Sequence, residues 1–205
     1  MEQNLIINGK EFIVNSIKRI EDDCLIVYSC SFEQELFEAI GIIEDNEKQK
    51  KKLFNNVYKL LKYVDRSPIS TPKLVENDKK RWYILRKSSK HPSVLDLLAE
   101  GELSEEIYKQ LFVIFKCAKS MGLNLDYNPL NFSFVDNKLT YDALTFNEYK
   151  EEENLINNGL MLWFYTLEAI KELEQRGYKK DKSRMMNRAE LNKTIVLKVY
   201  EYYQF

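Results

Sequence analysis

The chain has 205 residues, of which 44% are hydrophobic and 31% are charged, and its 31 basic and 32 acidic side chains nearly cancel. This length suits one domain or two small lobes that share a core. Because the net charge is close to zero, nothing in the charge balance indicates that the protein binds nucleic acid or an anionic membrane. No apolar run reaches the ~18 residues that span a bilayer, and the amino terminus has no signal-peptide core. We therefore expect a cytoplasmic protein without membrane insertion.

The first residues are predicted to form strands. Residues 5–7 and 12–14 are apolar and flank Asn8-Gly9, a pair that readily adopts the positive φ angles of a tight hairpin turn. Residues 24–29 form a third strand-like run. Residues 33–43 fit either a fourth strand or the start of a helix, and the pattern leaves both open.

A helix is expected next, with Asp45 as its cap and the loop around Pro68 and Pro72 as its end. Its apolar face follows helical spacing through Leu53, Val57, Leu60, Leu61 and Val64. A short aromatic and aliphatic strand is then predicted over residues 81–85.

The second half is predicted to be mostly helical. A short helix covers Ser93 to Glu100, and Ser104 caps a longer helix that ends at Gly122. The buried face of this longer helix is predicted to contain Ile107, Leu111, Ile114, Phe115 and Ala118. Toward the carboxyl end we expect one apolar helix over residues 155–175 and another over residues 189–203.

Polar residues cluster between the long helix and the carboxyl end. Asp126 and Asn131 are five residues apart with Pro129 between them, and a predicted hairpin with an Asp136-Asn137 turn leads back toward them and ends at Asp142. Oxygen ligands of this kind suit Mg²⁺, which binds one or two carboxylates together with phosphate oxygens. A separate carboxylate could accept a hydroxyl proton, as in phosphoryl transfer. Asp, Asn and Pro also dominate ordinary turns, so a purely structural turn is the alternative.

These residues resemble the catalytic loop of protein kinases, whose pattern is H-R-D-x-x-x-x-N followed by a hairpin and D-F-G. The resemblance covers roughly residues 81–175. It implies that Asp126 is the catalytic aspartate, that Asn131 and Asp142 are the metal ligands, and that Lys87 and Ser88, at the expected hinge, bind the cofactor. The implied cofactors are Mg²⁺ and ATP if the protein is active, and none otherwise.

Several parts of the kinase pattern are missing. Asn124-Leu125 replaces His-Arg, and Asp142 is followed by Ala143-Leu144 in place of Phe-Gly. We find no glycine-rich phosphate loop and no A-P-E motif. The nearest match to V-A-I-K, residues 38–41, has Gly41 at the lysine position. Only Lys59 or Lys62 on the following helix is a candidate to replace that lysine.

The sequence therefore predicts an α+β fold with two kinase-like lobes, a strand-containing lobe over residues 1–87 and a helical lobe over 88–205. The favoured function is a pseudokinase-type binding or scaffold module with weak or no nucleotide binding, and a larger bacterial assembly is a setting that would suit it. Two alternatives stay open: a small ATP- and Mg²⁺-dependent phosphotransferase, and an unrelated α+β protein whose loop matches by chance. The carboxyl terminus carries an aromatic cluster, Tyr200, Tyr202, Tyr203 and Phe205. This cluster either seals the core or forms a surface for a protein partner. The sequence does not indicate an oligomeric state.

Overall fold

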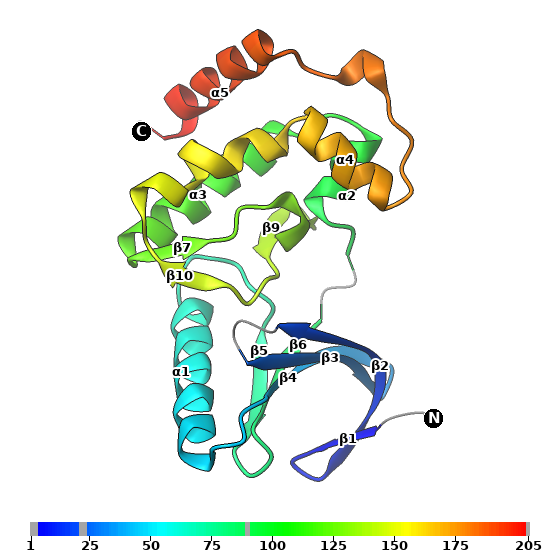
Figure 1. Ribbon diagram of the computed structural model, residues 1–205, viewed down its shortest axis with the longest axis vertical. Helices are drawn as coiled ribbons and strands as arrows, with labels where there is room; N and C mark the ends of the chain where they lie inside the picture. Colours follow the sequence, from blue (N-terminus) through cyan, green and yellow to red (C-terminus); the bar gives the residue numbers. More distant parts are fainter. Residues whose placement is uncertain (1–3, 21–23, 89–90, 204–205) are drawn as a thin grey trace. The chain divides into compact units, whose positions relative to one another are not determined.

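The structure is a computed structural model that describes residues 4–20, 24–88 and 91–203. The chain is an α+β protein with two compact units (Figure 1). The sheet unit comprises Met1–Ser67 and Thr71–Lys90, and the helical unit comprises Pro68–Ser70 and His91–Phe205.

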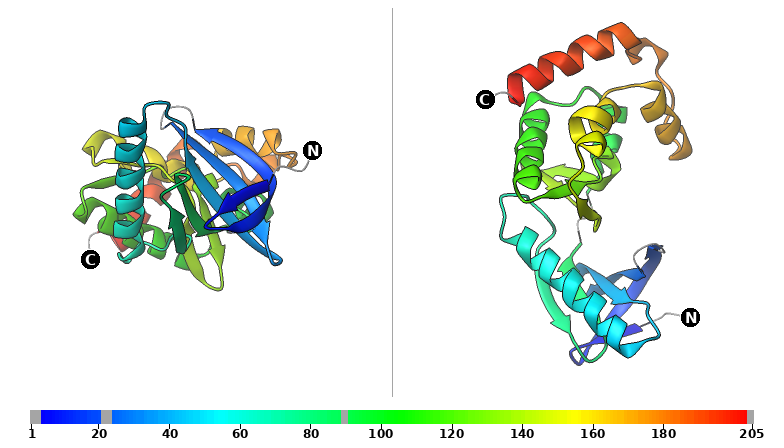
Figure 2. Two further views of the ribbon diagram at one scale, coloured as in Figure 1. Left: turned by 90° about the horizontal axis from the view of Figure 1, so that it is seen from below. Right: turned by 60° about the vertical axis from the view of Figure 1, so that its left-hand side comes forward.

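In the described part of the sheet unit, one antiparallel sheet has the strand order β1-β2-β3-β4-β6-β5. The strands are β1 (Asn4–Ile7), β2 (Lys10–Ile20), β3 (Leu25–Phe32), β4 (Glu35–Ile42), β5 (Leu74–Asp78) and β6 (Tyr83–Lys87). The sheet is curled (Figure 2), and its apolar cluster consists of Leu5, Ile7, Phe12, Tyr28, Cys30, Phe37, Ala39 and Leu85.

Two tight turns set the register of the first four strands. Asn8 and Gly9 have φ angles of 48° and 82°, which confirms the predicted hairpin between β1 and β2. The turn between β3 and β4 uses Glu33 and Gln34 at φ angles of 49° and 68°. Because Glu and Gln are uncommon in this left-handed region, their side chains gave no turn signal in the sequence.

Most of the ambiguous segment 33–43 forms β4, which follows the Glu33-Gln34 turn. Its residues Ala39, Ile40, Gly41 and Ile42 are all buried, so the strand is covered on both of its faces. A strand of this kind has no alternation of apolar and polar residues. The sequence pattern could therefore not distinguish it from a buried helix.

Helix α1 (Glu47–Asp65) packs against β4 and β5. Leu61 and Val64 of the predicted face are buried, and Phe54, which the pattern did not include, is buried as well. The predicted cap Asp45 is wrong. The side chain of Asn46 accepts hydrogen bonds from the backbone N–H groups of Lys48 and Gln49, both at 3.1 Å, because Asn46 directly precedes the first turn.

The strand predicted over residues 81–85 lies two residues later, in β6. Trp82 has a φ angle of 62° in the turn after β5, so the extended backbone begins at Tyr83. The ring of Trp82 packs edge-on against Phe54, with 5.5 Å between the ring centroids. The strand β5 itself was not predicted.

The described part of the helical unit contains four α-helices and two short strand pairs, together with 3-10 and π turns. The helices are α2 (Val94–Glu100), α3 (Glu105–Ser120), α4 (Leu167–Gln175) and α5 (Arg188–Tyr202). The strand pairs are β7 (Leu123–Leu125) with β10 (Phe146–Glu148), and β8 (Phe132–Val135) with β9 (Lys138–Tyr141). All five residues predicted for the buried face of α3 are buried, and so are Tyr108 and Phe112.

The single helix predicted over residues 155–175 is wrong. A π turn (Leu155–Gly159) and a 3-10 turn (Leu160–Trp163) come first, and α4 begins only at Leu167. Phe164 is extended, with φ −121° and ψ 159°, and Thr166 caps α4 by accepting a hydrogen bond from Ala169. Residues 160–165 are apolar throughout, so their pattern carried no sign of the break at Phe164.

The terminal helix α5 lies within one residue of its predicted bounds, but few of its side chains are buried. Leu191 is buried, whereas Tyr200 is 61% exposed and Tyr202 and Tyr203 are half-buried; Phe205 lies outside the described residues. Within the described residues, no helix combines the length and hydropathy needed to cross a membrane. All three cysteines are free, and Cys30 is buried.

Candidate functional site

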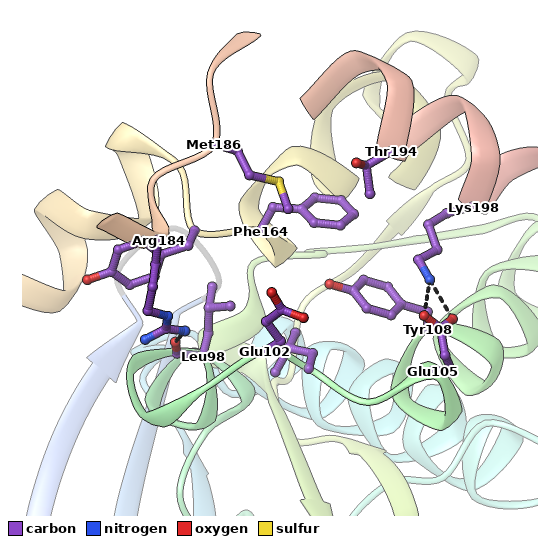
Figure 3. A pocket seen from close by; sticks show the side chains of 11 residues that line it. Leu98, Glu102, Glu105, Tyr108, Phe164, Arg184, Met186, Thr194 and Lys198 are labelled. Carbon is purple, nitrogen blue, oxygen red and sulfur yellow. Dashed lines mark hydrogen bonds and ion pairs between the residues drawn. The ribbon is translucent and has the colours of Figure 1, made fainter. Parts of the chain in front are cut away.

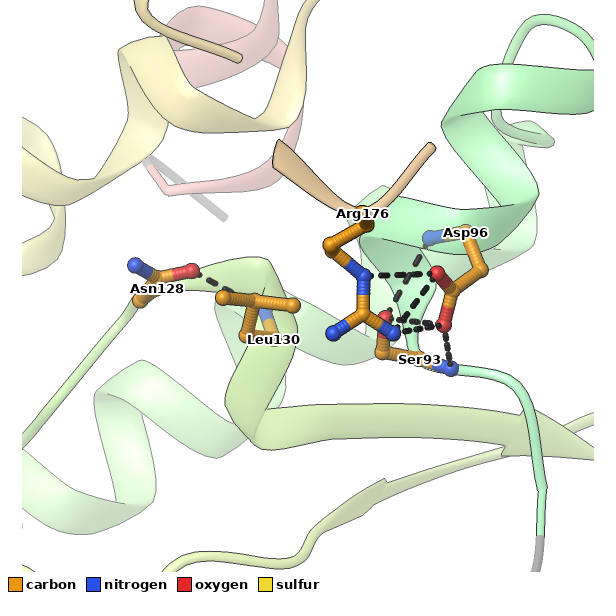
Figure 4. A network of polar contacts seen from close by, with 5 residues as sticks. All are labelled: Ser93, Asp96, Asn128, Leu130 and Arg176. Atoms are coloured by element: carbon orange, nitrogen blue, oxygen red, sulfur yellow. Dashed lines mark hydrogen bonds and ion pairs between the residues drawn. The ribbon is translucent and has the colours of Figure 1, made fainter. Parts of the chain in front are cut away.

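The loop that carries Asp126 and Asn131 is shaped by local backbone chemistry. After α3, Gly122 takes a φ angle of 70°, and the chain enters the short strand β7. Asn128 then caps a 3-10 turn (Pro129–Asn131) by accepting a hydrogen bond from Leu130 N at 3.0 Å (Figure 4). Proline suits the first position of this turn because its φ angle is preset and no N–H is needed there.

Hydrogen bonds connect the three polar residues that the sequence singled out. The Asn131 side-chain amide donates to the Asp126 carbonyl oxygen at 3.3 Å, and Asp142 N donates to the Asn131 carbonyl oxygen at 2.8 Å. The Asp126 carboxylate accepts a hydrogen bond from Asn128 N at 3.1 Å. Asp126 is exposed, whereas Asn131 and Asp142 are half-buried. The predicted hairpin thus brings Asp142 back beside Asn131.

Tyr141 holds the two ends of this arrangement together. Its buried hydroxyl donates to the Thr145 carbonyl oxygen at 2.7 Å and accepts from Asp126 N at 3.2 Å. Just beyond Thr145, β10 pairs with β7, with Phe146 opposite Leu125. The segment that follows Asp142 is therefore fixed against the strand that precedes Asp126.

Buried aromatic side chains pack against the loop and form hydrogen bonds with it. Trp163 is fully buried, and its indole N–H donates to the Tyr127 carbonyl oxygen at 2.8 Å. The Tyr108 hydroxyl donates to the Trp163 carbonyl oxygen at 2.9 Å. A β-carbon at Gly159 would lie 2.6 Å from the Tyr127 Cβ, so only glycine fits there. Tyr127 and Phe132 are both buried, as expected for residues that pack around the loop.

An ion pair near the start of α2 was not found by sequence reasoning. Arg176 donates to both carboxylate oxygens of Asp96, with distances between 2.9 and 3.1 Å, and Asp96 also accepts from the backbone and hydroxyl of Ser93 (Figure 4). Burial opposes ionisation of Asp96, but the bonds from Ser93 and Arg176 outweigh it and hold its pKa below the ordinary value. The Ser-x-x-Asp spacing signals a capping box. The partner Arg176, eighty positions away, has no local signal.

The two residues expected at the cofactor hinge belong to the sheet unit. Lys87 pairs with Glu35 at 2.6 Å, and its ammonium lies 4.6 Å from the centre of the Phe37 ring. Ser88 N donates to the Leu36 carbonyl oxygen at 3.1 Å. Both residues therefore continue the pairing of β6 with β4, whereas Asp126, Asn131 and Asp142 belong to the helical unit.

Gly41, which the nearest sequence match to V-A-I-K puts at the place of the lysine, is closely surrounded. A β-carbon there would lie 2.8 Å from Tyr83 Cε1 and 2.9 Å from Ile26 Cγ2, its neighbours on the flanking strands. The two lysines considered as replacements, Lys59 and Lys62, are exposed on α1. Lys62 lies over the ring of Tyr58, 5.9 Å from its centre.

The chain matches no protein-family model, and a search of curated proteins gave no relative. Within the part of the chain that the structure describes, no group of three or more His, Cys, Asp and Glu side chains is placed to hold a metal ion.

Proposed function

We propose that this protein is a kinase-like, pseudokinase-type module that binds a protein partner and does not transfer phosphate. The observation that carries the proposal is the packing around Gly41. A lysine there would need its β-carbon within 3 Å of the Tyr83 ring and of Ile26, a distance that real contacts essentially never show. Without this lysine, a kinase-like site loses its grip on the α- and β-phosphates.

The proposed kinship with kinases is supported by the helical unit. A long helix, a short strand, an Asp-x₄-Asn loop, a hairpin and a second aspartate follow one another in the order of the kinase catalytic region. The bonds of Asn131 to Asp126 and Asp142 join the three residues into one local structure. If Asp126 and Asn131 only formed a structural turn, there would be no need for a hairpin that brings Asp142 back to them.

The implied cofactors fit only in part. Asn131 and Asp142 offer an amide oxygen and a carboxylate, a donor set that suits Mg²⁺ when phosphate oxygens complete the coordination. The sheet unit does not fit the phosphates, because Gly41 is enclosed and Lys87 is paired with Glu35. We therefore assign no phosphoryl-transfer step to this chain.

The second candidate function is an active Mg²⁺- and ATP-dependent phosphotransferase. The hydrogen bonds that connect Asp126, Asn131 and Asp142 favour it. Thermal melting of the full chain with Mg²⁺ and ATP separates the two. A nucleotide that binds the folded state at a hundred times its Kd stabilises by about 2.7 kcal/mol. We expect no shift of the melting midpoint at millimolar Mg²⁺-ATP.

A matched pair of variants gives this experiment its control. Asp142→Asn changes the proposed metal ligand, and Asp136→Asn makes the same change at the exposed turn of the same hairpin. A melting shift that Asp142→Asn abolishes and Asp136→Asn keeps would overturn the proposal in favour of an active Mg²⁺-nucleotide site. A shift that both variants keep would mean that nucleotide binds elsewhere.

A further inference from the structure

A cavity of about 160 Å³ lies within the helical unit, under the carboxyl-terminal segment. Its walls come from α2, α3 and the break before α4 on one side, and from residues 184–198 on the other (Figure 3). Leu98, Leu103, Phe164 and Met186 make the walls largely apolar. An apolar cavity of about 150 Å³ is large enough to bind benzene, so this one can hold a single small ring.

The two cations in the walls are already used by the protein. Arg184 donates to the carbonyl oxygens of Ala99 and Leu98 at 2.9 and 2.7 Å, and its guanidinium stacks 4.4 Å from the centre of the Tyr165 ring. Lys198 binds the Glu105 carboxylate, which also accepts from the Tyr202 hydroxyl at 2.5 Å. Neither cation is left over to attract an anionic ligand.

Glu102 is different from the other charged residues of the cavity. Glu102 is exposed, it forms no hydrogen bond and no ion pair among the described residues, and Figure 3 shows its carboxylate beside Tyr108 in the wall of the cavity. The pKa of Tyr108 is raised mostly by burial and further by the carboxylates of Glu105 and Glu102, so the charge of Glu102 is felt in the cavity. The cavity therefore combines apolar walls with one exposed carboxylate that has no protein partner among the described residues.

We propose that this cavity is a binding site for a small arylalkyl ammonium ion, with the ring between Leu98, Phe164 and Met186 and the ammonium on Glu102. A charge-assisted hydrogen bond to the carboxylate supplies the orientation, and burial of the ring supplies most of the affinity. Tyr108 and Phe164, whose stacked rings lie 5.3 Å apart, add aromatic surface that favours a cation nearby.

Occupation of the site would also tie down the carboxyl-terminal segment. Met186, Thr194 and Lys198 lie in the walls, while Leu191 is the one buried residue of α5 among those described. A ligand that contacts both sides of the cavity binds the closed arrangement better than an open one. Amide hydrogen exchange in residues 182–203 should therefore slow when the ligand is present.

The test compares 2-phenylethylamine with its neutral analogue 2-phenylethanol, by calorimetry or ligand-observed NMR on the full chain. We expect the amine to bind at least tenfold more tightly at low salt. Glu102→Gln should remove this preference while leaving weak binding of the alcohol, and Glu100→Gln, an exposed carboxylate outside the cavity, should keep it.

A second variant locates the site. Thr194→Phe places a larger side chain in the wall that α5 contributes, and it should abolish binding of both compounds. The proposal fails if the amine shows no saturable binding to the wild type, if Glu102→Gln keeps the preference, or if Thr194→Phe binds like the wild type. None of these outcomes involves nucleotide, so they are independent of the proposed pseudokinase function.

Discussion

The sheet unit and the helical unit stabilise their interiors in different ways. The sheet unit combines backbone pairing and apolar packing with the ion pair of buried Arg86 and Glu38 at 2.6 Å, and at Gly41 the packing leaves no room for a side chain. The helical unit uses buried side-chain hydrogen bonds, with Tyr108 bonded to Trp163 and Trp163 bonded to Tyr127.

This difference bears on function. The helical unit holds a polar loop in a defined conformation, because aromatic donors satisfy the carbonyl groups that the loop buries. In the sheet unit, side chains of the neighbouring strands fill the space around Gly41, which the proposed kinship equates with the kinase lysine position. The proposed function therefore draws on the loop for the kinship with kinases and on Gly41 for the absence of phosphate transfer. Each unit contains one tryptophan, so when one tryptophan is replaced, the fluorescence of the other reports on its own unit.

The largest effect is expected for Trp163→Phe. The change leaves the Tyr127 carbonyl without its donor and opens space in a fully buried position, so it should lower the free energy of unfolding by about 3 kcal/mol. Urea unfolding followed by circular dichroism measures the loss, and fluorescence of Trp82 reports on the sheet unit in the same sample. Trp82→Phe, at a half-buried turn, is the control. Equal costs for the two variants would contradict the contrast between the units.

Gly41→Ala tests the packing of the sheet unit. The added methyl group would overlap the Tyr83 ring, which already packs edge-on against Tyr28 at 6.0 Å, so we expect a loss of about 1–3 kcal/mol. Gly101→Ala is the matched control. It has an extended backbone at φ −177° and nothing within 4 Å of the new methyl group, so its stability should be unchanged or slightly higher. A neutral Gly41→Ala would show that the position can open, and it would weaken the proposed function.

The smallest effect concerns pH and the Asp96–Arg176 pair. The pKa of folded Asp96 lies below the usual 3.8 of the unfolded chain, so its stabilisation is complete above that pH and is lost as the pH falls through the lower folded value. We expect Asp96→Asn to cost about 1–2 kcal/mol at pH 7. The difference from the wild type should shrink below about pH 4. Measurements of unfolding between pH 7 and 2.5 check this, with the exposed Asp45→Asn as control. A difference that stays constant over this range would show that the charge of Asp96 is not responsible.

The loop residues show how far local reasoning reaches. Asp126, Asn131 and Asp142 could be selected because a capped turn and a two-residue hairpin turn are encoded by nearby residues: Asn128 with Pro129, and Asp136 with Asn137, whose φ angles are 49° and 62°. The aromatic bonds beneath the loop could not be selected, since Tyr108, Tyr127 and Trp163 are far apart in the chain and each reads only as a core residue.

By itself, the sequence determined the elements whose signals are local. The Asn8-Gly9 turn, the Ser93 cap and the periodic face of α3 each depend on a few neighbouring residues and their backbone preferences. The tertiary structure alone decided the break at Phe164, the burial of β4 on both faces and the pairing of Asp96 with Arg176. These features depend on which distant surfaces meet, and an apolar or charged residue carries no mark of its partner along the chain.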